Sequence, residues 1–91
     1  MKTVRRHYNF FGIVQGVGFR YTAQYAANAY GVTGWVRNEY DGSVTMEVQG
    51  REDQLDRIEN AIRNARYIRV DRVLCREVSA VSGEKDFRVR Y

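Results

Sequence analysis

Hydrophobic and polar positions along this chain change their period several times, and each change marks the boundary of an expected element. Residues 4–14 are rich in aromatic and β-branched side chains, which predicts a first strand. Apolar residues then recur every three or four positions from Phe19 to Tyr30, and Gly31 follows as a typical helix stop. The first third of the chain therefore predicts a strand, a glycine-rich turn and a helix.

The remaining pattern continues in the same way. Alternating or apolar runs predict further strands at 32–38, 44–48, 70–78 and 87–91. Turn-forming residues at 39–42 join the first two of these strands into a β-hairpin. A second amphipathic helix is expected from Arg51 onward, because Leu55, Ile58 and Ile62 form an apolar stripe at helical spacing.

This order of elements, βαββαβ with 87–91 ending the chain as a strand, defines the expected fold class. Such an order is typical of an α+β, ferredoxin-like sandwich, in which an antiparallel sheet carries two helices on one face. The 91 residues are enough for one core and too few for two, and the sequence contains no proline and no linker. We therefore expect a single domain over residues 1–91.

Composition indicates the cellular compartment and the kinds of ligand expected for this domain. Cys75 is the single cysteine and is expected to be a small buried side chain of an apolar strand rather than a nucleophile. No apolar run is long enough for a signal peptide or a membrane span, which predicts a cytoplasmic protein without a membrane partner. The net charge of +4 favours anionic ligands. Basic residues are scattered instead of clustered, so nucleic acid is not the expected partner.

The turn at 12–20 is the strongest candidate for chemistry. Its glycines allow backbone N–H groups to converge, and the helix that follows adds unpaired donors and positive dipole character. Arg20, in the first turn of that helix, opposes the helix dipole unless an anion is bound, and its guanidinium can hold two phosphate oxygens. The pattern predicts a phosphate site built from Arg20 and the backbone amides of Gln15, Gly16, Val17, Gly18 and Phe19.

Several motifs together resemble the acylphosphatase family over nearly the whole chain. They are Gly-x-Val-Gln-Gly-Val-Gly-Phe-Arg at 12–20, Gly-Trp-Val-Arg-Asn at 34–38, Asp-Gly-Ser-Val at 41–44, Gln-Gly at 49–50 and Phe-Arg-Val-Arg-Tyr at 87–91. The resemblance implies a small cytoplasmic hydrolase that cleaves the carboxyl–phosphate bond of acyl phosphates and releases inorganic phosphate. Two departures are visible: Ile13 replaces a residue that is often basic, and 64–68 replaces a Gly-Pro-rich link.

By motif, the resemblance assigns function to Arg20 and Asn38. Arg20 closes the phosphate loop, and the Asn38 amide orients an attacking water, which a carboxylate would do only while repelling the phosphate. A carboxylate leaving group needs no general acid, so positioning and charge stabilisation suffice. We expect no metal, no cofactor and a monomer. Two other interpretations stay open: a non-catalytic anion-binding regulatory module, and, less favoured, an RNA-binding domain, whose aromatic strand signature is missing.

Three further side chains are weaker candidates for function, because an ordinary structural role explains each of them. His7 lies in a strand without a partner at ligand spacing, so we expect an ordinary strand residue. Tyr21 and Tyr25, four residues apart, would fit an exposed aromatic patch for a partner or an acyl group. Packing of both rings within the fold is the favoured expectation for this pair.

Overall fold

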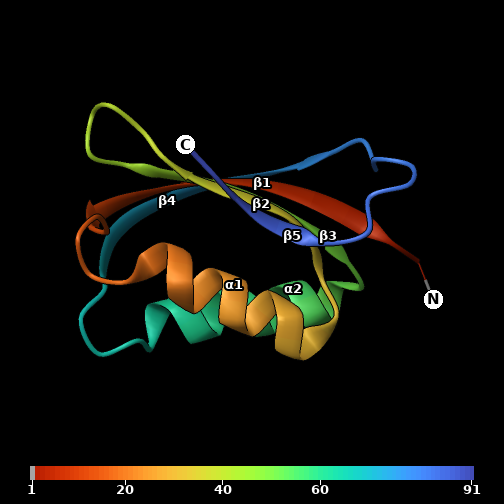
Figure 1. Cartoon of the computed structure of the whole chain (residues 1–91), viewed down its shortest axis with the longest axis horizontal. Coiled ribbons are helices and arrows are strands. Elements are labelled where there is room, and N and C mark those ends of the chain that lie inside the picture. Colours follow the sequence, from red (N-terminus) through yellow and green to blue (C-terminus); the bar gives the residue numbers. More distant parts are fainter. Residues whose placement is uncertain (1) are drawn as a thin grey trace.

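A computed structural model describes residues 2–91 as one five-stranded sheet with two helices packed on one of its faces (Figure 1). In chain order, the elements are β1 (Val4–Ile13), α1 (Phe19–Tyr30), β2 (Thr33–Asn38), β3 (Val44–Gly50), α2 (Glu52–Arg63), β4 (Arg69–Val78) and β5 (Phe87–Arg90). The strands and α1 begin and end within two residues of their predicted positions, and α2 begins one residue after its predicted start. The expected α+β class and ferredoxin-like arrangement are therefore confirmed.

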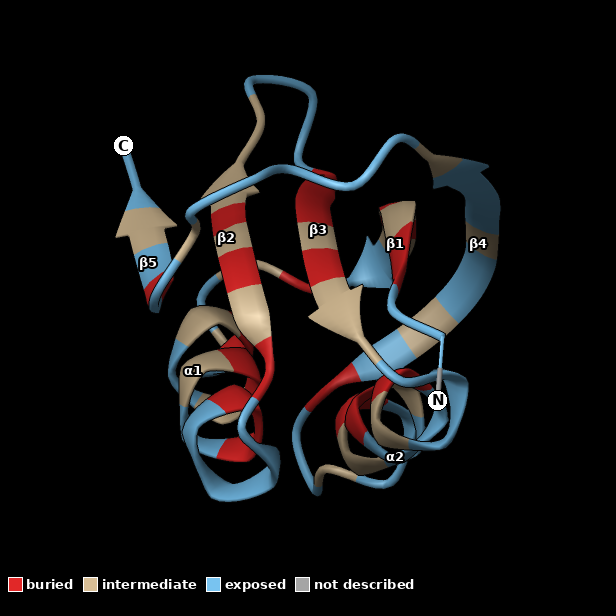
Figure 2. Cartoon of the chain, turned by 90° about the vertical axis from the view of Figure 1, so that its right-hand side faces the viewer, coloured by how far each residue is buried: buried red, intermediate tan, exposed pale blue. Residues whose placement is uncertain are grey.

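The sheet departs from the expectation at one strand pair. The strand order is β4-β1-β3-β2-β5, and all neighbours are antiparallel except β2 and β5, which are parallel. The chain reverses direction after β4, and residues 79–86 carry it across to the opposite edge of the sheet (Figure 2). Because β5 docks there beside β2, which already runs in the same direction, the prediction of a fully antiparallel sheet was wrong at this pair.

The core lies between the sheet and the helices. Alternation along the strands directs every second side chain toward the helices, and Tyr8, Phe10 and Met46 are fully buried there. From the other side, α1 contributes Phe19 and small alanines, and α2 contributes the predicted stripe Leu55, Ile58 and Ile62. This apolar layer fixes the start of α1 against the end of β1, where the candidate site is formed.

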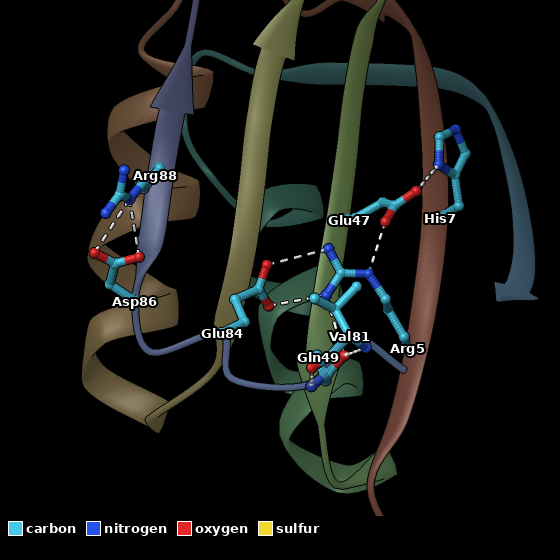
Figure 3. Close-up of polar contacts among 8 residues, drawn as sticks. All are labelled: Arg5, His7, Glu47, Gln49, Val81, Glu84, Asp86 and Arg88. Carbon is cyan, nitrogen blue, oxygen red and sulfur yellow. Dashed lines mark hydrogen bonds and ion pairs between the residues drawn. The ribbon is translucent and has the colours of Figure 1, made fainter. Parts of the chain in front are cut away.

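The opposite, open face of the sheet holds a network of charged side chains centred on Arg5 (Figure 3). Arg5 is only 2% exposed, and its guanidinium donates to Glu47 Oε1 at 2.7 Å and to Glu84 Oε1 at 2.8 Å. His7 Nδ1 lies 2.5 Å from the other oxygen of Glu47, so His7 is a partly buried strand residue, as expected. The network holds residues 79–86 against the sheet.

Three exposed side chains differ from their expected burial. Tyr21 and Tyr25 are 72% and 68% exposed, because α1 packs with its alanine face and directs both rings outward. Cys75 is also exposed, because β4 is an edge strand whose residues are exposed or half-buried along its length. Between residues 2 and 91, no helix has the length and apolarity needed to cross a membrane.

Candidate active site

The candidate site begins at the loop between β1 and α1. Val14 and Phe19 are 1% and 2% exposed, so the two ends of the loop are fixed in the core. Between them, Gly16 and Gly18 have φ values of 73° and 78°, in the left-handed region that glycine adopts without strain. The loop therefore combines two rigid ends with a backbone path that other residues would adopt only at a cost.

The Gln15 side chain holds this loop against the β2–β3 turn. Its Nε2 donates to the backbone oxygens of Glu39 and Ser43, at 2.7 and 2.9 Å. The turn itself closes through a hydrogen bond from Glu39 N to Ser43 O at 2.8 Å. Sequence reasoning considered only the backbone of Gln15 and missed this bracing role, because no local pattern reveals a partner 24 residues away.

The N-terminus of α1 has no capping side chain. Gly18 occupies the N-cap position, and the first turn contains no acidic residue. In contrast, α2 has Glu52 and Asp53 in its first turn, and Gln54 Oε1 accepts a hydrogen bond from Arg51 N at 2.8 Å. The positive end of α1 thus lacks the internal compensation that α2 has, which favours an external anion.

Arg20 projects from this first turn and is half-buried. Its guanidinium carbon lies 5.3 Å from the centroid of the Tyr91 ring, an arrangement that orients the planar group by cation–π attraction. Within residues 2–91, no carboxylate forms an ion pair with Arg20. The forked donors of Arg20 are therefore free to hold an oxyanion.

Asn38 is the last residue of β2 and lies on the same side of the sheet as buried Val36. Its Oδ1 atom is buried and accepts no hydrogen bond from any residue that the structure describes. Leaving a buried acceptor unsatisfied costs about 1–3 kcal/mol. Asn38 Oδ1 is therefore a candidate acceptor for a ligand or a water molecule.

The carboxylates next to Asn38 in the sequence are held by their own partners. Glu39 Oε2 pairs with Arg37 at 3.1 Å, and hydrogen bonds from Thr45 and Arg37 lower the pKa of Glu39. Asp41 Oδ1 accepts hydrogen bonds from the Ser43 hydroxyl at 2.5 Å and from Ser43 N at 3.0 Å, which lowers the pKa of Asp41. Both groups stabilise the hairpin turn and stay ionised at neutral pH.

A cavity of about 290 Å³ brings the two candidate side chains together. Its lining is Val14, Gly16, Gly18, Phe19, Arg20, Tyr21, Gln24, Asn38, Val89 and Tyr91. Four of the six predicted loop positions are in this lining; Gln15 and Val17 are not, and Val17 packs against the core instead. A phosphate contact from the backbone of these two residues stays a prediction.

Fold and site together define an α+β domain with a cavity, lined by Arg20 and Asn38, at a strand–helix junction. The acylphosphatase family model matches residues 6–89, so the chain belongs to the acylphosphatase family. It is 40% identical over 81 residues to the acylphosphatase of Clostridium acetobutylicum, covering 88% of this chain and 89% of that protein. It is 43% identical over 81 residues to the acylphosphatase of Geobacillus kaustophilus, covering 88% and 86%.

A solved structure agrees with this assignment. The crystal structure of acylphosphatase from Bacillus subtilis superimposes with a TM-score of 0.89 and 31% sequence identity, covering 97% of this chain and 99% of that one. The likeness extends over the sheet and both helices, and so includes the junction that carries the cavity.

Proposed function

We propose that this member of the acylphosphatase family hydrolyses acyl phosphates to a carboxylate and inorganic phosphate at the cavity between the β1–α1 loop and the end of β2. The observation that carries the proposal is the shared cavity of Arg20 and Asn38: a cation without an ion-pair partner beside a buried amide oxygen without a hydrogen bond, both judged within residues 2–91. The first binds the phosphate and the second binds water.

The phosphoryl group binds at the N-terminus of α1. Backbone N–H groups of residues 15–20 donate to its oxygens, and the Arg20 guanidinium holds two of them at once. Phosphoryl transfer passes through a loose transition state whose charge is spread over these oxygens. Donors that are already in place stabilise this charge without reorganising during the reaction. The glycines of the loop and the contact of Arg20 with Tyr91 hold these donors in place before the substrate binds.

Asn38 positions the attacking water. Its buried Oδ1 accepts a hydrogen bond from the water and leaves the lone pair of the water oxygen free to face phosphorus. The water oxygen forms a bond to phosphorus, while the bond from phosphorus to the bridging oxygen breaks and its electron pair stays on the leaving carboxylate. The proton that the water loses passes to a phosphate oxygen, so no side chain serves as a general base.

The remaining expectations belong to the same proposal. Hydrolysis needs no metal ion or other cofactor, because Arg20 and the helix end supply the positive charge; activity that persists in EDTA tests this. The proposal also includes a cytoplasmic location and a monomeric state, the latter because the residues that line the cavity come from one chain. Nucleic acid is not proposed as a ligand, since the basic residues are scattered along the sequence and the aromatic strand signature of RNA-binding domains is missing.

Arg20→Lys tests the phosphate clamp. The lysine keeps the charge but loses the planar fork, so we expect kcat/KM for benzoyl phosphate to fall by about 10²-fold and the inhibition constant for phosphate to rise. Arg57→Lys is the matched control, because Arg57 is exposed on α2 and away from the cavity. Kinetics of Arg20→Lys indistinguishable from the control would remove Arg20 from the site.

Asn38→Ala tests the positioning of water. We expect kcat to fall by about 10²- to 10³-fold while the inhibition constant for phosphate changes little, because the amide contacts water and not the phosphate. Asn28→Ala is the control, because Asn28 is an exposed residue of α1, and this variant keeps full activity. An equal loss of phosphate affinity and of turnover would show that Asn38 binds phosphate instead.

The same assay separates the proposal from the alternatives. A non-catalytic anion-binding module binds phosphate but leaves benzoyl phosphate intact apart from its spontaneous decay. An RNA-binding domain retains RNA in a salt-dependent way and shows no turnover. Hydrolysis in excess of the spontaneous rate, inhibited by phosphate and lost in Arg20→Lys, supports the enzyme.

A further inference from the structure

The cavity continues past the phosphate loop along α1. Arg20 and Gln24 are one helical turn apart and therefore lie on the same side of the helix, with Tyr21 adjacent. Val89 and Tyr91 line the cavity from the other side. Figure 2 shows α1 and β5 along the same edge of the molecule. We call the part of the lining formed by Tyr21, Gln24, Val89 and Tyr91 the second end of the cavity, and the part formed by the loop the phosphate end.

Apart from the contact of Tyr91 with Arg20, packing does not account for the side chains at the second end. Tyr21 is 72% and Tyr91 is 98% exposed, although each lines the cavity. Gln24 is half-buried, and its amide forms no hydrogen bond with the described part of the chain. Two accessible rings, one valine and one unpaired amide suit an apolar group that carries a single polar atom.

We propose that this second end binds the acyl group, with Tyr21 and Tyr91 contacting its apolar part and the Gln24 amide donating a hydrogen bond to its carbonyl oxygen. The inference rests on the proposed function, because the acyl group reaches the second end only when the phosphate of the same substrate is bound at the loop. It assigns a preference for aromatic or other bulky apolar acyl phosphates over acetyl phosphate.

The Gln24 hydrogen bond has a second effect. As the bond from phosphorus to the bridging oxygen breaks, negative charge spreads over both oxygens of the leaving carboxylate. A donor at the carbonyl oxygen stabilises this charge more strongly in the transition state than in the ground state, and so raises kcat. Inorganic phosphate has no carbonyl group, so its binding does not involve Gln24.

The first experiment measures the ratio of kcat/KM for benzoyl phosphate to that for acetyl phosphate. Tyr21→Ala lowers this ratio by about fivefold or more, because an aromatic contact is lost only with the larger substrate. Tyr21→Phe keeps the ring and restores the ratio. Tyr67→Ala is the matched control, since Tyr67 is 67% exposed and lies outside the cavity lining. An unchanged ratio in Tyr21→Ala refutes the aromatic contact.

The second experiment separates the acyl group from the phosphate. Gln24→Ala lowers kcat for both substrates by about tenfold and leaves the inhibition constant for inorganic phosphate unchanged. A rise of that constant, or an unchanged kcat, refutes the role of Gln24. If the wild-type protein hydrolyses neither substrate, the proposed function itself fails. If it hydrolyses both substrates and the Tyr21 and Gln24 variants behave as the wild type does, the proposed function stands and the acyl subsite is refuted.

Discussion

At the residue scale, Arg5 and Gln15 find hydrogen-bond partners for their polar side chains within the fold, whereas the buried Oδ1 atom of Asn38 does not. Arg5 is 2% exposed, yet Glu47 and Glu84 accept its hydrogen bonds, so its burial is satisfied inside the fold. Gln15 is satisfied in the same way by two backbone oxygens. Asn38 Oδ1 alone is buried without a partner among residues 2–91. The contrast distinguishes side chains that hold the structure from Asn38, whose proposed partner is the attacking water.

Gly34 provides a stability test at this scale. A Cβ atom there would lie 1.9 Å from the backbone oxygen of Glu47, and φ is 142°. We therefore expect Gly34→Ala to lower the free energy of unfolding by about 3 kcal/mol, measured by urea denaturation. Gly83→Ala is the control with a positive φ and nothing within 4 Å, and should cost about 1 kcal/mol. Equal losses in the two variants would contradict the steric explanation.

Glu47 gives a prediction for pH. Burial alone raises its pKa, but hydrogen bonds and positive charge from His7 and Arg5 outweigh this and lower the pKa below the ordinary value of 4.5. The ionised form is thus favoured in the folded state, and its stabilising contribution is complete above pH 4.5 and lost as pH falls through the lower folded pKa.

Urea unfolding of the wild type and Glu47→Gln between pH 3 and pH 7 checks this. The wild type should be the more stable protein at pH 7, and the difference between the two should shrink below pH 4.5. A difference that stays constant over the whole range would show that the Glu47 charge does not contribute.

At the scale of elements, the β1–α1 loop depends on the β2–β3 turn through Gln15. Gln15→Ala removes both hydrogen bonds to that turn, so we expect the loop to lose its fixed shape and the inhibition constant for phosphate to rise by about tenfold. Gln54→Ala is a matched control: its amide also joins two segments, through Tyr30 O and Arg51 N, but away from the cavity.

The two variants should lose similar stability, about 1–2 kcal/mol, because each removes two hydrogen bonds of the same kind. Phosphate affinity should fall only in Gln15→Ala. If it fell equally in both, the effect would reflect general destabilisation and the bracing role would be wrong.

Most elements were predictable from the sequence because their signals are local. The stripe of Leu55, Ile58 and Ile62 sets the buried face of α2, and alternation sets which side of each strand is buried. The candidate role of Arg20 likewise comes from a local signal, since a cation at the start of a helix opposes the dipole, and it stays a prediction. Asn38 was assigned through the family resemblance, because a strand-ending asparagine is otherwise a common turn residue.

Other features depend on distant parts of the chain and were not predictable. Periodicity does not tell which strand lies next to which, so the parallel pairing of β2 and β5 was missed. Cys75 has the neighbours of a core strand in sequence, but β4 is at the edge of the sheet. Tyr21 satisfies helical spacing on a face that the alanines of α1 leave exposed.

At the scale of the whole molecule, phosphate binding and folding are linked. A ligand that binds only the folded state stabilises it, so phosphate at about 100 times its Kd should add about 2.7 kcal/mol. For a domain of this size the melting temperature should rise by roughly 10 °C or more. Differential scanning calorimetry in phosphate and in chloride of equal ionic strength measures the shift.

Arg20→Met supplies the control for this experiment. Phosphate also stabilises proteins in a general way by exclusion from their surface, and this part of the shift should persist in the variant. The specific part should disappear with the guanidinium. Equal shifts in the wild type and in Arg20→Met would show that phosphate does not bind at this cavity.

The cavity draws on residues near both extremes of the sequence, with Arg20 on one wall and Val89 and Tyr91 on the other. During synthesis, the ribosome therefore delivers one wall of the cavity some seventy positions after the other. A nascent polypeptide that already carries both helices still lacks β5 and the Tyr91 ring beside the Arg20 guanidinium. Turnover would thus begin only after residues 87–91 have been added and β5 has paired with β2, so its onset reports completion of the sheet.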